Sequence, residues 1–193
     1  MYLKLALKNM KQSTKDYLIY MITLVLSVAM FYGFFSIVSP YYSNMLPISI
    51  HMEILNKAMR IAVPAVGILI LFLVSYVNRY MLKRKQKEFA LQTIIGMEQR
   101  TVAWIFFLEN LMIGALALIL GILSGTILSQ LINAAVLKAF KQEFKLYFML
   151  FPDTVLWTVC FFGIIFFITG LKNVRTIRKM KIIDMIQNSQ KGT

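Results

Sequence analysis

Residues 17–38 read YLIYMITLVLSVAMFYGFFSIV, a run of 22 residues that contains no charged side chain. As an α-helix this run is about 33 Å long at 1.5 Å per residue, which matches the hydrocarbon thickness of a bilayer. Three later stretches are similarly apolar. In lipid, a helix satisfies its own backbone polar groups, which an open chain or sheet edge cannot do. The sequence therefore predicts an all-α integral membrane protein with four spanning helices, at about residues 17–38, 61–80, 101–132 and 154–171.

The composition excludes several soluble classes of protein. Hydrophobic residues make up 59% of the 193 residues and charged residues 15%, with 21 basic against 8 acidic side chains and a formal net charge of +13. A disordered basic tail is far less hydrophobic. A nucleic-acid-binding domain collects its basic residues on one soluble face, so we expect no nucleic-acid partner. The single cysteine and single histidine exclude an internal disulfide and a zinc site of the Cys/His type.

The basic residues are divided unequally between the two sides of the predicted spans. Sixteen of the 21 lie on one side, in the N-terminal segment, in the loop between the second and third spans, and in the tail after the fourth. Cytoplasmic loops carry an excess of Lys and Arg, so this distribution predicts that both termini face the cytoplasm.

The segments outside the spans are short. In residues 1–16, apolar side chains repeat at helical spacing among four lysines, which indicates an amphipathic helix on the cytoplasmic face of the bilayer. A basic segment that only sets the topology explains this pattern equally well. The outer loops, at about 39–57 and 138–153, are too short for a folded extracellular domain. Residues 172–193 form a basic cytoplasmic tail.

The cytoplasmic loop at residues 83–100 carries the clearest local pattern. It begins as a basic run and continues as FALQTIIGM, in which Phe89, Gln92, Thr93 and Gly96 recur at a spacing of three to four residues. This pattern predicts a short amphipathic helix that ends at Gly96, because glycine readily adopts the backbone conformation that follows a helix. Such a helix can dock in a groove of a soluble partner. The alternative is a solvated loop that only follows the positive-inside rule.

The third span contains small residues and one acid. Gly121 and Gly125 form a small-xxx-small pattern, and Gly114 precedes them on the same helix. Such glycines let helices approach closely, either within the chain or across a dimer. Glu109 lies near the inner end of this helix, where the cost of a charge is modest, and we expect it to form a salt bridge or a helix contact there. A proton relay needs several ionisable groups at depth, and none accompanies Glu109 in the sequence.

Groups suited to catalysis are missing from the sequence. It has no glycine-rich phosphate loop that ends in Lys-Ser or Lys-Thr, and no pair of Asp or Glu residues suited to acid–base chemistry. We therefore expect that this chain is not an enzyme and that it holds no catalytic residue, metal or cofactor.

Residues 87–125 resemble the FtsX-like permease domain of ABC transporters. The similarity lies in KEFALQTIIGM at 87–97, in ENLMIG at 109–114, and in the glycines at 121 and 125. The basic segment VRTIRKMKIIDMI at 174–186 is similar to the one that follows the fourth span in this family. In that segment the chain is most similar to the bacitracin-resistance-type permeases.

The resemblance implies a permease subunit in a bacterial cytoplasmic membrane that works with a dimer of separate ATPase subunits, which bind ATP and Mg²⁺. A second permease, identical or different, would complete the transporter. Related systems export or dislodge antimicrobial peptides, move lipids or lipoproteins, or activate cell-wall hydrolases. They act by mechanotransmission, in which closing of the ATPase dimer rocks the spans. By similarity, the helix seated on the ATPase would consist of Glu88, Phe89, Gln92, Thr93, Gly96 and Met97.

The sequence departs from the family pattern in two respects. It has no large extracellular domain between the first and second spans, and it has four spans where the bacitracin-type permeases have ten. We therefore expect that this subunit does not capture peptides through an ectodomain. Two other functions stay open: an ion-driven four-span transporter that uses Glu109, and a non-transporting scaffold that binds partners through its basic faces.

Overall fold

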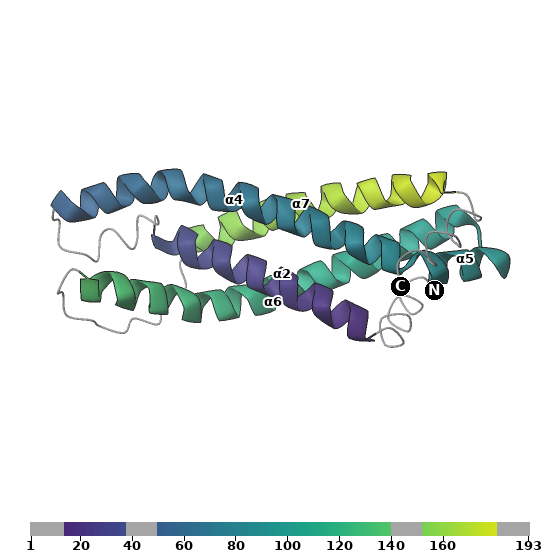
Figure 1. Cartoon of the computed structure of the whole chain (residues 1–193), viewed down its shortest axis with the longest axis horizontal. Coiled ribbons are helices and arrows are strands. Elements are labelled where there is room, and N and C mark those ends of the chain that lie inside the picture. The colour runs from purple at the N-terminus through teal and green to yellow at the C-terminus, as the bar shows by residue number, and fades with distance from the viewer. Residues whose placement is uncertain (1–13, 38–49, 140–151, 181–193) are drawn as a thin grey trace. The chain divides into compact units, whose positions relative to one another are not determined.

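The computed structural model describes residues 14–37, 50–139 and 152–180. In chain order, these residues form the helices α2 (Thr14–Ile37), α4 (Ile50–Arg84), α5 (Gln86–Ile94), α6 (Gln99–Ala139) and α7 (Pro152–Lys179) (Figure 1). No β-strand occurs in these described ranges, and the predicted all-α fold is confirmed.

Four helices are long and apolar enough to cross a membrane. Their candidate spans are Tyr17–Ile37, Arg60–Arg84, Gln99–Ile132 and Pro152–Lys179. These helices leave many large apolar side chains uncovered, such as Ile61 and Phe72 of α4. Acyl chains would cover such side chains in a bilayer. The predicted set of four spans is confirmed, and the protein is an integral membrane protein.

Three helices continue beyond the predicted spans. Helix α4 begins at Ile50, inside the predicted outer loop, and α6 continues to Ala139. Helix α7 passes through several basic residues to Lys179, although its uncharged run ends at Leu171. Boundaries drawn at the nearest charged residues make these helices too short. Lys and Arg are good helix formers, and their long side chains reach water while the backbone stays helical.

Two predicted segments fall mainly outside the described residues. These are the amphipathic helix at 1–16, of which only residues 14–16 are described, and the second outer loop at 138–153. The tail predicted at 172–193 is described as far as Met180, and its first residues belong to α7.

The described chain divides into two compact units, and α2, α4, α6 and α7 each contribute residues to both. Unit 1 takes the described residues of Met1–Thr23, Val74–Leu116 and Ile164–Thr193. Unit 2 takes those of Leu24–Leu73 and Ala117–Gly163. The short helix α5 belongs to unit 1.

In unit 2, α6 approaches α2 through glycine. A Cβ atom on Gly121 would lie 2.5 Å from the Cβ atom of Val28, and one on Gly125 would lie 3.0 Å from the Cβ atom of Tyr32. Both glycines therefore pack against α2 of the same chain, and a side chain at either position would force the two helices apart.

The hydroxyl groups of unit 2 include several that bond within their own helix. Ser36 Oγ donates to the Gly33 carbonyl at 2.8 Å, Ser129 Oγ to the Thr126 carbonyl at 2.8 Å, and Thr158 Oγ1 to the Thr154 carbonyl at 2.7 Å. A buried hydroxyl can thus be satisfied in lipid without a partner from a second helix.

Unit 1 also has close contacts at glycine, between α6 and α7. A Cβ atom on Gly114 would lie 2.7 Å from the ring of Phe166, and one on Gly170 would lie 2.7 Å from the ring of Phe107. Each helix therefore offers a glycine to an aromatic ring of the other, which fixes the register of this pair.

Buried polar side chains join three further helix segments of unit 1. The Tyr20 hydroxyl of α2 donates to Asn78 Oδ1 of α4 at 3.3 Å. Asn173 Nδ2 of α7 donates to the same oxygen at 3.1 Å. Because a polar group without a partner is costly in lipid, this shared acceptor holds α2, α4 and α7 in one arrangement.

Candidate coupling site

Helix α5 is attached to α4 almost without a break. A single residue, Lys85, separates the two helices, and its backbone is helical, with φ −82° and ψ −5°. The Lys85 N–H donates to the Met81 carbonyl at 3.1 Å, and the Phe89 N–H donates to the Lys85 carbonyl at 3.0 Å. Backbone hydrogen bonds therefore join Lys85 to α4 on one side and to α5 on the other, and the two helices are continuous in hydrogen bonding.

The other end of α5 is closed by Gly96. Its φ of +100° is in the region that glycine tolerates best. The Gly96 N–H donates to the Thr93 carbonyl at 3.1 Å, and the Met97 N–H donates to the Gln92 carbonyl at 3.0 Å. This pair of bonds is a Schellman motif, and it ends the helix where the sequence predicts. Helix α6 begins shortly afterwards, at Gln99.

One face of α5 is anchored to α6. Phe89 and Ala90 are buried, and the Phe89 ring makes an edge-to-face contact with the ring of Phe106, with centroids 5.1 Å apart. Aromatic pairs of this geometry add to the stability that burial of their area provides. Phe89 therefore holds α5 in place and is not available to a partner.

The beginning of α5 is anchored by a buried cation. Lys85 is only 2% exposed, and its Nζ atom forms an ion pair with the half-exposed carboxylate of Glu88. The same Nζ atom lies 4.4 Å from the centre of the Tyr17 ring, within the range of a cation–π interaction. The Tyr17 hydroxyl donates to the carboxylate of Glu109, which is also 2% exposed. We call these four residues the Lys85 cluster, and they connect α5 through α2 to α6.

These contacts within the Lys85 cluster are contacts between helix segments. Its cation is engaged with Glu88 and with the face of an aromatic ring, and the Tyr17 hydroxyl is engaged with Glu109. Glu109 thus makes the helix contact expected from the sequence, and its partner is a hydroxyl of α2.

The outer face of α5 is apolar and uncovered. Leu91 and Ile94 are 59% and 61% exposed, and Ile95, directly after the helix, is 82% exposed. They recur at helical spacing on the side opposite the anchored residues. Gln92, Thr93 and Met97 are half-buried, and Gly96 is exposed. Of the residues predicted to meet a partner, Gly96 is exposed and Glu88 is half-exposed.

Sequence reasoning did not single out the residues of the uncovered face of α5 or the buried Lys85. Leu91, Ile94 and Ile95 recur at helical spacing, but so does the set that contains Phe89. Phe89 has the larger apolar side chain, so the sequence favours the set that contains Phe89 as the contact face. Lys85 carried no local signal, because it stands in the basic run from Lys83 to Lys87.

Comparison with known proteins gives these features a context. Residues 61–182 match the family described as FtsX-like permease C-terminal. The chain is 27% identical over 186 residues to bacitracin export permease protein BceB of Bacillus subtilis. The aligned region covers 95% of this chain and 28% of that protein. It is 24% identical over 188 residues to the uncharacterized ABC transporter permease YvcS of the same organism, with coverages of 97% and 29%. It is also 24% identical over 181 residues to BceB of Halalkalibacterium halodurans, with coverages of 94% and 28%. The chain spans less than a third of the length of these relatives.

Proposed function

The chain belongs to the FtsX-like permease family of ABC transporters, and from this premise we propose that it is a permease subunit whose helix α5 couples a separate ATPase to the movement of the spans. Members of this family are proteins of the cytoplasmic membrane, and so is this chain. In this proposal ATP and Mg²⁺ bind to the partner ATPase subunits, and a second permease, identical or different, completes the transporter.

The observation that carries the proposal is the division of α5 into an anchored face and an uncovered apolar face. Exposed apolar patches outside a lipid-covered region are characteristic of protein contacts, and a short amphipathic helix is a recurring element of such contacts. Leu91, Ile94 and Ile95 form the patch, which fits an apolar groove on an ATPase. Phe89 and Lys85 tie the opposite side to α6 and α2, so a push on the patch reaches the spanning helices.

The orientation predicted from charge is consistent with this role. If the basic segments face the cytoplasm, then α5 lies on the side of the membrane where ATP is available. Cysteine substitutions at exposed positions outside the spans, Ile95→Cys after α5 and Ala58→Cys near the other end of α4, test the orientation in a Cys160→Ser background. Only the first should be shielded from a membrane-impermeant maleimide in intact cells.

For the substrate we propose a peptide antibiotic of the bacitracin type. The support is that two relatives are bacitracin export permeases. Because the chain covers less than a third of those proteins, the capture of the peptide is assigned to the assembled transporter and not to this subunit alone.

The decisive experiment measures ATP hydrolysis by the complex. The chain is co-expressed with a candidate ATPase subunit from the same genome, and the complex is purified and reconstituted into vesicles. The variant Ile94→Asn/Ile95→Asn should insert into the membrane normally and lose most of the ATPase association. The matched variant Ile94→Leu/Ile95→Leu should retain it, because the apolar surface is preserved. Equal association and equal hydrolysis by all three proteins would overturn the assignment of α5.

A second candidate function has one observation in its favour. Glu109 is an acid buried in a spanning helix, as an ion-driven transporter requires. In that case Glu109→Gln should abolish transport, and transport should proceed without an ATPase. A non-transporting scaffold, in contrast, should assemble normally with its partners. Deletion of its gene should leave both the ATPase rate and the antibiotic resistance of the cell unchanged.

A further inference from the structure

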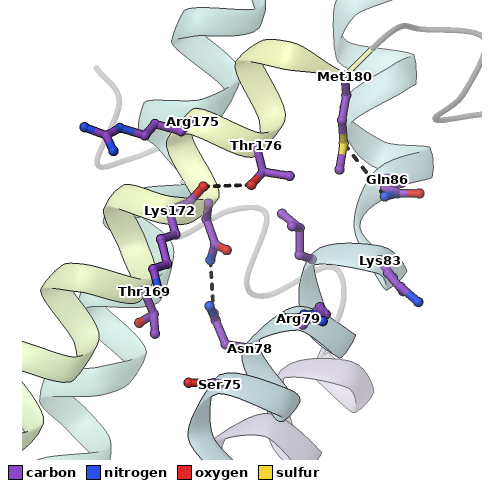
Figure 2. A pocket seen from close by; sticks show the side chains of 12 residues that line it. Ser75, Asn78, Arg79, Lys83, Gln86, Thr169, Lys172, Arg175, Thr176 and Met180 are labelled. Atoms are coloured by element: carbon purple, nitrogen blue, oxygen red, sulfur yellow. Dashed lines mark hydrogen bonds between the residues drawn. The ribbon is translucent and has the colours of Figure 1, made fainter. Parts of the chain in front are cut away.

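A cavity lies between the C-terminal ends of α4 and α7 in unit 1 (Figure 2). Its volume is about 540 Å³. The cavity is lined by residues of α4 from Ser75 to Lys83, by Gln86 at the beginning of α5, by residues of α7 from Thr169 to Thr176, and by Met180 directly after α7. It is separate from the outer face of α5, so the coupling proposal does not account for it.

The cavity is strongly basic. Arg79 and Lys83 of α4 and Lys172 and Arg175 of α7 are among its lining residues, and all four are exposed at its rim. Figure 2 shows these side chains on the two helices that border the cavity. No aspartate or glutamate is among the lining residues, and within the described part of the chain none of the four cations forms an ion pair. Four like charges around one cavity repel one another, so an anion that entered would relieve this repulsion.

The floor of the cavity supplies neutral hydrogen-bonding groups. Asn78, Gln86 and Asn173 are buried and line it. Asn173 Nδ2 already donates to Asn78 Oδ1, whereas the buried Oε1 atom of Gln86 has no hydrogen-bond partner in the described chain. A buried acceptor without a partner calls for a donor, which water or a hydroxyl of a ligand can supply. The cavity therefore suits a ligand that carries both an anionic group and a hydroxyl.

The cavity lies at the boundary between the apolar and basic parts of the two helices. Ser75 and Thr169 belong to the uncharged runs, and the four cations follow these runs toward the ends of the helices. On α7, Ile168 and Leu171 present exposed apolar side chains beside the polar residues of the cavity. A molecule with a charged head and apolar tails would place its head at the basic residues and its tails along the apolar ones.

We propose that this cavity binds the phosphate-bearing headgroup of an anionic phospholipid of the phosphatidylglycerol class. The phosphate accepts hydrogen bonds from the basic side chains, the glycerol hydroxyls can donate to Gln86 Oε1, and the acyl chains lie along the exposed apolar surface. Basic pockets between spanning helices on the cytoplasmic side of membrane proteins bind such headgroups. Gln86 is also the first residue of α5, so the bound lipid would contact the helix that we assign to coupling.

Native mass spectrometry of the purified full chain tests the proposal. The protein is released from detergent in the presence of phosphatidylglycerol, phosphatidylcholine or inorganic phosphate, and the bound adducts are counted. Lys172→Gln/Arg175→Gln and Arg79→Gln/Lys83→Gln remove two cavity charges from either helix. Arg178→Gln/Lys179→Gln is the matched control, because these exposed cations belong to the same end of α7 and do not line the cavity.

The wild type and the control should bind phosphatidylglycerol in preference to phosphatidylcholine. Each cavity variant should bind it about tenfold or more weakly, since each basic residue contributes about one kcal/mol. An equal loss in the control, or equal binding of the two lipids, would refute a specific headgroup site. Displacement of the lipid by millimolar inorganic phosphate would show that a soluble anion is the ligand and would overturn the lipid assignment. Loss of ATPase association in the cavity variants with unchanged lipid preference would assign the cations to an acidic protein surface instead.

The readout is independent of the coupling proposal. Lipid binding to the chain alone needs no ATPase. If Ile94→Asn/Ile95→Asn did not affect hydrolysis, the coupling proposal would fail and the lipid-binding result would stand. If the cavity variants bound lipid normally, the lipid proposal would fail and the coupling result would stand.

Discussion

The ammonium nitrogen of Lys85 lies 4.4 Å from the centre of the Tyr17 ring, and the Glu88 carboxylate is its ion-pair partner. This contact joins α2 to the junction between α4 and α5, which are linked to each other through a single residue. Lys85 is therefore a structural lysine in a basic run whose other members, such as Lys83 and Lys87, are exposed. The predictions below follow from contacts of this kind.

Lys85→Met should destabilise the protein, because it keeps the apolar stem and removes the charge that meets Tyr17 and Glu88. We expect a loss of about 1–2 kcal/mol, which is the size of a desolvated cation–π interaction. Glu88 adds little, since it is half-exposed and screened. Unfolding by sodium dodecyl sulfate, followed by tryptophan fluorescence in mixed micelles, measures the change. Lys87→Met removes an exposed charge of the same type, and an equal effect of the two substitutions would contradict the buried contact.

Tyr17→Phe should cost more than Glu109→Gln. The first removes the hydroxyl that donates to the buried Glu109 carboxylate, and a hydrogen bond to a charged group is worth about 1.5–3 kcal/mol. The second keeps an acceptor for the Tyr17 hydroxyl and removes a charge from a buried position. The same unfolding measurement ranks the two variants. Tyr76→Phe, at an exposed position of α4, is the control and should have almost no effect. A reversed order would show that the charge of Glu109 matters more than its hydrogen bond.

Gly121→Ala should separate α2 from α6. The new methyl group would lie 2.5 Å from the Val28 Cβ atom and 3.2 Å from the Val25 carbonyl oxygen. Overpacking of this kind costs about 1–3 kcal/mol. Gly163→Ala meets nothing within 4 Å and should be neutral, or stabilising by up to about 1 kcal/mol through helix propensity.

A second substitution isolates the cause. Val28→Gly removes the Cβ and Cγ1 atoms that the new methyl group would meet, so it should cost less stability in the Gly121→Ala background than in the wild type. If Gly121→Ala and Gly163→Ala behave alike in thermal unfolding, then the contact between α2 and α6 is not a close one.

Gly96→Ala should loosen the end of α5 without a steric clash. An added Cβ atom meets nothing within 4 Å, but the φ of +100° is unfavourable for any residue with a side chain. The cost is about 1–2 kcal/mol, and Gly96→Asn should recover part of it because asparagine tolerates positive φ better than alanine. Hydrogen exchange of the Gly96 and Met97 amides, which close the Schellman motif, should be faster in Gly96→Ala and intermediate in Gly96→Asn. Unchanged exchange in both variants would show that the backbone does not hold this conformation in solution.

The spans, the α5 helix and its end at Gly96 could be predicted from the sequence because each depends on local information. An uncharged run of about 20 residues spans a bilayer whatever its neighbours are. A glycine after an amphipathic turn ends a helix by a bond between residues only five positions apart, as Met97 and Gln92 are. These features need no knowledge of tertiary packing.

The face of α5 that is free could not be predicted in this way. Phe89 is covered only because Phe106, on the next helix, meets its ring. Lys85 is buried because Tyr17 of α2, far away in the sequence, lies beneath it. The basic cavity could not be predicted for the same reason. Its cations come from two segments about 90 residues apart, and each segment by itself indicates only the orientation of the spans. Pairing of distant segments decides these cases, and periodicity within one segment does not report it.

The hydrogen bonds of Ser36, Ser129 and Thr158 have a consequence for motion. Each of these hydroxyls bonds a carbonyl of its own helix, so the bond moves with the helix when it turns or slides. For these side chains, sliding within unit 2 breaks no hydrogen bond. In unit 1 the bonds of Asn78 to Tyr20 and Asn173 run between helices and would have to be exchanged for new ones. The bonds of Asn78 should therefore add to the activation barrier to helix sliding, whereas those of Ser36, Ser129 and Thr158 should not.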